Sequence, residues 1–147
     1  MIKWLKKGVV YMVEPINIIW NKTKKNVEEV INKYIYYNLS VDDCSDPLRK
    51  DEFLLEIIDI EKQVNCPLKT YEEKKKRIDY INYVRYSFNK LTSDERKVIY
   101  WTYLDKENNY DDRFIANSLG FSLGYYYIKK KETLIRFAYS LGVEVTE

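Results

Sequence analysis

Apolar residues recur at helical spacing along most of the chain, with charged residues between them. From about Lys22 to Tyr37 they fall every three or four positions, which is typical of an amphipathic helix. A second long helix is predicted from Thr70, which opens a capping box with Glu73, to about Asn89. Its expected buried seam consists of Ile78, Ile81, Val84, Phe88 and Leu91. The pattern therefore predicts helices as the main elements.

Two further stretches of the N-terminal half carry local structural signals. Residues 1–20 contain β-prone runs broken by a proline, so an extended arm or a small hairpin is expected there. Further on, Asp46 and Pro47 have the sequence of a helix start, with Asp as the N-cap and Pro at the first helical position. We expect this helix to carry the apolar residues from Leu48 to Val64.

The last third of the chain contains three consecutive helix starts. Thr92 and Glu95 form a second capping box, which predicts a helix to about Leu104. Asp111 or Asp112 is expected to cap a short helix after a polar loop. The third helix is expected to start after a serine cap and to be the longest of the three.

The segment from Ile115 to Ser122 has the residue order of a helix-turn-helix. Ala116 is small, as a close crossing of two helices requires, and Gly120 can adopt positive φ where the chain leaves the first helix. Phe121 can fill the space between the helices, and Ser122 can cap the second one. The sequence thus predicts an all-α protein: an N-terminal helical region over residues 1–69, then a helix-turn-helix unit over residues 70–147.

In such a unit the second helix, here predicted from Leu123 to about Leu141, enters the major groove of DNA. We expect three residues nearest the bases: Tyr125, Ile128 and Lys131. The phosphate contacts are assigned to Arg113, Asn117, Lys129, Lys130 and Arg136. The remaining candidate DNA-binding residues are Ser122, Gly124 and Tyr127.

Each of these features also has a purely structural interpretation. The three tyrosines from Tyr125 to Tyr127 can belong to a core, and Tyr126 is the one expected to be packed. The lysines from Lys129 to Lys131 can form a solvated helix face. A three-helix bundle that does not bind DNA can carry the same turn. The motif alone leaves these alternatives open.

The composition argues against an enzyme. The 147 residues include no histidine and only four glycines, and no phosphate-binding glycine motif is present. Acidic residues are numerous but lack metal-ligand spacing, so neither a metal, a cofactor nor a catalytic residue is expected. Cys44 and Cys66 are read as reduced thiols, because they form no CxxC pair.

The N-terminal segment resembles a signal peptide only briefly. Its apolar run, residues 8–13, is too short and lacks a cleavage site. No stretch approaches the roughly 18–20 apolar residues of a membrane span. A cytoplasmic protein without a membrane partner is expected.

Two stretches of the sequence resemble the ArpU-type transcriptional regulators of Gram-positive phages and prophages, which include the LtrC-like late-gene activators. The first is NKTKKNV at residues 21–27, continuing to Tyr34. The second runs from Leu91 through the LGFS turn at residues 119–122 and LIRFA at residues 134–138 to LGVEV at residues 141–145. It is similar to the helix-turn-helix of that family, which itself resembles region 4 of sigma factors.

The resemblance implies a regulator that binds double-stranded promoter DNA in the bacterial host cell and activates late genes for packaging, morphogenesis or lysis. It also suggests docking near host RNA polymerase. Two alternatives remain: a sigma-like adaptor that docks on RNA polymerase, and a protein-interaction modulator without strong DNA binding. A homodimer is common among helix-turn-helix proteins, although no zipper-like seam indicates one here.

The distribution of charge makes the net charge of +2 more informative. Residues 1–38 carry seven basic and three acidic side chains, and residues 39–73 carry four and ten. Residues 74–147 carry fourteen basic and ten acidic side chains. Near-neutrality is therefore an average over a basic start, an acidic middle and a basic end, and the basic end contains the predicted DNA-binding unit.

Overall fold

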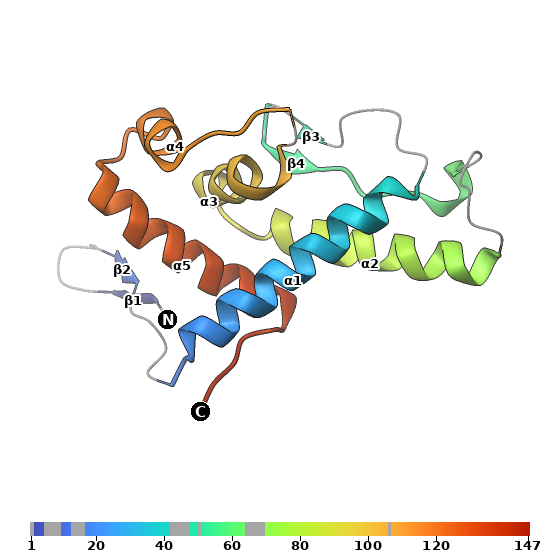
Figure 1. The fold of residues 1–147 in the computed structure, drawn as a ribbon, viewed down its shortest axis with the longest axis horizontal. Coiled ribbons are helices and arrows are strands. Elements are labelled where there is room, and N and C mark those ends of the chain that lie inside the picture. The colour runs from blue at the N-terminus through green and yellow to red at the C-terminus, as the bar shows by residue number, and fades with distance from the viewer. Residues whose placement is uncertain are drawn as a thin grey trace.

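A computed structural model describes residues 2–4, 10–12, 17–41, 48–49, 51–63, 70–105 and 107–147 (Figure 1). The fold is mostly helical, which confirms the expected all-α class at this level. The α-helices are α1 (Trp20–Leu39), α2 (Tyr71–Asn89), α3 (Ser93–Ile99), α4 (Asp112–Ser118) and α5 (Leu123–Leu141). The short elements are β1 (Ile2–Trp4), β2 (Val10–Met12), β3 (Leu48–Arg49), β4 (Leu54–Leu55), the 3-10 turn η2 (Ile60–Lys62) and the π-helical turn η3 (Tyr100–Leu104).

The three long helices pack on one another, with α5 against both α1 and α2 and with α1 against α2 (Figure 1). Their apolar faces meet because each carries the three-to-four residue spacing that the sequence shows. All five residues of the predicted seam of α2 are buried. The largest apolar cluster includes Val27, Ile31, Ile81, Phe88, Phe137 and Leu141. It draws side chains from both sides of residue 69, so the two expected domains pack closely against each other.

The C-terminal segment returns to the start of α1 (Figure 1). The amide of Ile19 donates to the carbonyl of Val145 over 2.8 Å, and the amide of Val145 donates to the Thr23 hydroxyl over 3.0 Å. Asn26 adds a side-chain bond to the carbonyl of Val143 over 3.1 Å. These bonds satisfy backbone groups that a helix start and a chain end otherwise leave unpaired.

The prediction of a helix after Asp46 and Pro47 is wrong over the residues that the structure describes. Residues 48–49 and 54–55 form the antiparallel pair of β3 and β4, and η2 follows at residues 60–62. Phe53, in the connecting turn, has φ 57°, which a helix does not allow. Asp46, Pro47 and Val64 lie outside the described residues.

Side chains of α2 explain why this segment is extended. Asn89 accepts from the amide of Leu55 and donates to its carbonyl, each over 2.9 Å. Asn82 makes the same pair of bonds with Ile58, over 2.8 and 2.9 Å. Buried Arg85 donates to the carbonyl of Glu56 over 2.7 Å. These bonds take the backbone groups that a helix would use internally.

At the N-terminus, β1 pairs antiparallel with β2, in agreement with the expected arm or small hairpin. The positions differ in part. The β-prone runs span residues 9–13 and 16–20, and only the first contains a strand, β2, while the second ends at Trp20, where α1 begins. The remaining predicted helices occur close to their expected bounds.

Candidate functional site

Within the predicted DNA-binding unit of residues 70–147, α3, α4 and α5 pack around a second apolar cluster. Its buried members are Val98, Ile115, Ala116 and Tyr126. Aromatic and aliphatic side chains close the cluster at its edges: Trp101, Tyr110, Leu119, Phe121 and Leu123. The cluster packs the start of α5 against α4 and α3, and Figure 1 shows how these three helices are arranged.

Each of the three helices begins at a side-chain cap. Thr92 and Glu95 form both halves of the predicted capping box at α3. Asp111, the first of the two predicted candidates, accepts from the amide of Phe114 over 2.8 Å. Ser122 accepts from the amide of Tyr125 over 3.2 Å. The caps fix where α4 and α5 begin, and therefore which residues form their first turns.

The turn between α4 and α5 has the local geometry that the sequence predicts. Gly120 has φ 72°, in the left-handed region that glycine adopts without strain. The amide of Phe121 donates to the carbonyl of Ala116 over 2.9 Å, which closes the end of α4. Ala116 is buried where α4 meets α5, consistent with its small size.

Asp112 joins α4 to α5. Its Oδ1 accepts from the Tyr126 hydroxyl and from Lys130 Nζ, each over 3.0 Å. Tyr126 is fully buried, as predicted, and burial raises the pKa of its hydroxyl, with a further rise from the Asp112 carboxylate. Lys130 was assigned to a phosphate but is an ion-pair partner of Asp112 in this structure.

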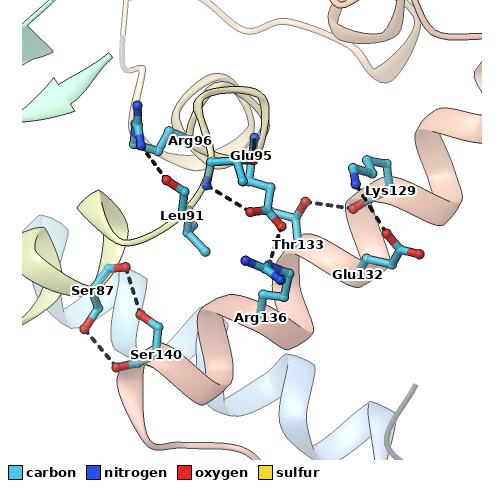
Figure 2. A network of polar contacts seen from close by, with 10 residues as sticks. Ser87, Leu91, Glu95, Arg96, Lys129, Glu132, Thr133, Arg136 and Ser140 are labelled. Carbon is cyan, nitrogen blue, oxygen red and sulfur yellow. Dashed lines mark hydrogen bonds and ion pairs between the residues drawn. The ribbon is translucent and has the colours of Figure 1, made fainter. Parts of the chain in front are cut away.

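Arg136, another residue assigned to a phosphate, points toward α3 (Figure 2). Its Nε lies 2.8 Å from Oε2 of Glu95, whose side chain is 2% exposed. Oε1 of the same carboxylate accepts from the amide of Thr92 over 3.0 Å. The ion pair therefore connects the capping box of α3 to the middle of α5.

Two more lysines of α5 also have partners. Lys129 Nζ lies 3.6 Å from Oε2 of Glu132, one turn further along α5 (Figure 2). Burial raises the pKa of Glu132, and Lys129 partly opposes this rise. Lys131 Nζ lies 5.1 Å from the centre of the Trp20 ring on α1.

The exposed candidate residues gather at the first two turns of α5. The exposed fractions are 48% for Tyr125, 50% for Tyr127 and 61% for Ile128. Gly124, one turn before Ile128, is exposed as well, and a Cβ added to it meets nothing within 4 Å. On α4, Arg113 and Asn117 are exposed, and their side chains form no ion pair or hydrogen bond within the described residues.

Sequence reasoning missed two features of this site. One is the joining role of Asp112, which was considered only as a cap. The other is Phe114, which is exposed and stacks on Tyr110, with ring centroids 4.3 Å apart and an interplanar angle of 7°. A helical wheel of α4 indicates that Phe114 is exposed, because Ile115 and Ala116 already occupy the side of this helix that faces the core.

A scan against protein-family models finds no match, and searches of curated proteins and of solved structures find none either. The resemblance to ArpU-type regulators therefore rests on the sequence motifs alone. Within the described residues, no helix is long and apolar enough to cross a membrane. Over the same part of the chain, no group of three or more cysteine, aspartate or glutamate side chains is placed to hold a metal ion.

Proposed function

We propose that this chain is a sequence-specific DNA-binding transcriptional regulator that places the first turns of α5 in the major groove. One observation carries the proposal. The capped start of α5 presents Tyr125, Tyr127 and Ile128 to solvent, while Tyr126 between them anchors the helix in the second apolar cluster. A recognition helix needs this combination of a fixed backbone and outward side chains.

The basic residues support the proposal, but the residues available for phosphate contacts differ from those that the sequence predicts. Arg113 and Asn117 on α4 are available to phosphates, since their side chains are exposed and have no partner within the described residues. Lys130 and Arg136 are occupied by Asp112 and Glu95. We therefore assign the phosphate contacts first to α4, the helix that lies across the backbone in this class of DNA-binding unit.

The resemblance of the two terminal stretches to ArpU-type regulators supplies the proposed target. The protein would bind promoter DNA and activate late genes of a phage or prophage. A dimer that binds two half-sites is compatible with the proposal, because it doubles the contacts on a palindromic site.

The test is the salt dependence of binding to a labelled duplex of 24 base pairs of mixed sequence, followed by fluorescence anisotropy. We expect binding that weakens steeply as salt rises, because phosphate contacts release counterions. Arg113→Ala is expected to reduce the slope of log affinity against log salt by about 1. Lys76→Ala, at an exposed position of α2, is the control and leaves the slope unchanged. Absence of binding even at low salt contradicts the proposal.

A second function is favoured by the aromatic surface of α4. Phe114 is exposed and stacked on Tyr110, and such aromatic surfaces are enriched at protein interfaces. A polymerase-docking adaptor or a protein-interaction modulator would use this surface. Its signature is stable association with host RNA polymerase that Phe114→Ala abolishes, together with negligible affinity for duplex DNA at low salt.

A further inference from the structure

The exposed face at the start of α5 has an unusual chemistry for a recognition surface. Gly124 and Ile128 lie one turn apart, with Tyr125 and Tyr127 on either side. Residues 123–128 include no amide, guanidinium or carboxylate side chain. Those groups read guanine, adenine and cytosine through hydrogen bonds to their major-groove edges. The tyrosine hydroxyls are the only side-chain hydrogen-bonding groups among residues 123–128, and Lys131, one turn beyond Ile128, lies over the Trp20 ring.

Gly124 gives an independent indication that a partner approaches the helix backbone here. A glycine inside a helix is less favourable than alanine, because it loses more backbone freedom on folding. The free protein has room for a side chain, since an added Cβ meets nothing within 4 Å. The fold therefore does not require glycine at this position, and a glycine lets another molecule approach the helix backbone more closely than a residue with a side chain would.

The charges around this face fit a polyanion. Helix α5 carries four basic residues and one acidic residue, Glu132, which is paired with Lys129. Asp112 and Glu95, on the neighbouring helices, are paired with Lys130 and Arg136. The paired carboxylates offer little repulsion to phosphates, while α5 as a whole stays positive.

We propose that this face recognises DNA through the C5-methyl groups of thymine, an inference that rests on the proposed function. Ile128, the most exposed apolar side chain of the face, would cover methyl groups on the floor of the major groove. Gly124 lets the base edges approach the helix backbone, and the two tyrosine rings cover the apolar surface on each side. The preferred sites are therefore rich in thymine at the positions under α5.

The experiment begins with selection of bound duplexes from a random library of 20 base pairs by the full-length protein. The enriched duplex is then synthesised with thymine and with uracil at each A·T pair, which removes only methyl groups. We expect uracil to weaken binding by about 4-fold for each methyl group that the protein covers. Ile128→Ala should bind the two duplexes equally. Leu39→Ala, at an exposed apolar position of α1, is the matched control and should keep the full discrimination.

Gly124→Ala tests the close approach separately. Its thermal stability should equal or exceed that of the wild type, so weaker binding cannot be attributed to unfolding. We expect affinity for the thymine duplex to fall about 10-fold, because the added methyl group must be accommodated against the bases. Unchanged affinity of this variant overturns the close approach at Gly124.

The remaining outcomes separate the inference from the function. Equal binding of thymine and uracil duplexes, or DNA binding without any enriched sequence, overturns methyl recognition and leaves DNA binding intact. Absence of binding to the library at low salt overturns the proposed function itself, and the inference with it.

Discussion

The two halves of α5 lie in different surroundings although they belong to one helix. From Leu123 to Glu132, where every residue is described, Tyr126 alone is buried. The second half packs on α1, α2 and α3, and its buried residues are Thr133, Leu134, Ile135, Phe137, Ala138 and Leu141. The second half, called the held half, is packed in the main core of the fold. The first half, called the projecting half, rests on α4 through Tyr126 and Lys130 and exposes its other side.

This difference shows that charge alone does not identify a binding surface on α5. Arg136 lies in the held half and compensates the buried charge of Glu95, which makes it part of the structure. Tyr125 and Ile128 lie in the projecting half, where both side chains stay exposed although the Tyr125 ring packs edge-on against Phe121. The assignment of roles therefore follows position along the helix more than residue type.

Arg136→Ala is expected to have the largest effect on stability. It leaves the carboxylate of Glu95 buried without its ion-pair partner, which costs about 3 kcal/mol in the free energy of unfolding. Urea unfolding measures this loss. Lys129→Ala is the control, because its pair with Glu132 is longer, at 3.6 Å, and involves a partly exposed lysine, so it contributes less than about 1 kcal/mol.

Arg136→Ala also tests whether the held half of α5 has a purely structural role. If Arg136→Ala unfolds like the wild type yet lowers the salt slope of DNA binding by about 1, Arg136 contacts a phosphate as the sequence assignment had it. The held half of α5 would then belong to the binding surface as well.

Tyr126→Phe tests the buried anchor of the projecting half and is expected to have an intermediate effect. It removes the hydroxyl that donates to Asp112 while the buried ring stays in place, and we expect a loss of about 1 kcal/mol. Tyr127→Phe, next to it but half exposed, should unfold at the wild-type urea concentration. Equal stability of the wild type and both variants would show that the hydrogen bond from Tyr126 to Asp112 contributes nothing to the free energy of unfolding.

Glu132→Gln, at the boundary of the two halves, is expected to have the smallest effect. Burial raises the pKa of Glu132 in the folded state, Glu95 adds to this rise, and Lys129 and Arg136 oppose it. A raised pKa means that the folded state disfavours the ionised form, so wild-type stability from this group is lost as pH rises through the folded pKa. At pH 7 the variant should be more stable, by at most about 1 kcal/mol.

The pH dependence gives the control for this prediction. The advantage of Glu132→Gln should shrink as pH falls and vanish once the wild-type carboxyl is protonated in both the folded and the unfolded state. An advantage that is independent of pH, or a less stable variant at pH 7, contradicts the assigned effect of burial.

Local signals in the sequence account for most of the predicted elements. Caps at Thr70, Thr92, Asp111 and Ser122 mark helix starts through bonds that span three residues, so neighbouring residues suffice to identify them. Periodicity found the seam of α2, and the positive φ of Gly120 followed from the turn pattern. Tyr126 was correctly expected to be packed.

The features that the sequence did not reveal have one common cause, which is pairing between residues far apart in sequence. The segment after Pro47 has helical character, yet Asn82 and Asn89 bind its backbone from α2 and hold it extended. Arg136 lies on the polar arc of a helical wheel, and its partner Glu95 is on another helix. The wheel shows which face is polar but not which polar groups face a neighbour.

The most direct test of DNA binding by the projecting half of α5 is a titration of the ¹⁵N-labelled protein with a 20-base-pair duplex, followed by amide NMR spectra. We predict that the amide signals of Gly124, Tyr125 and Ile128 shift or broaden first, while those of Ser87 and Ser140 in the polar network of Figure 2 stay unchanged. Spectra that do not respond at low salt, or shifts confined to α1 and α2, would contradict the account.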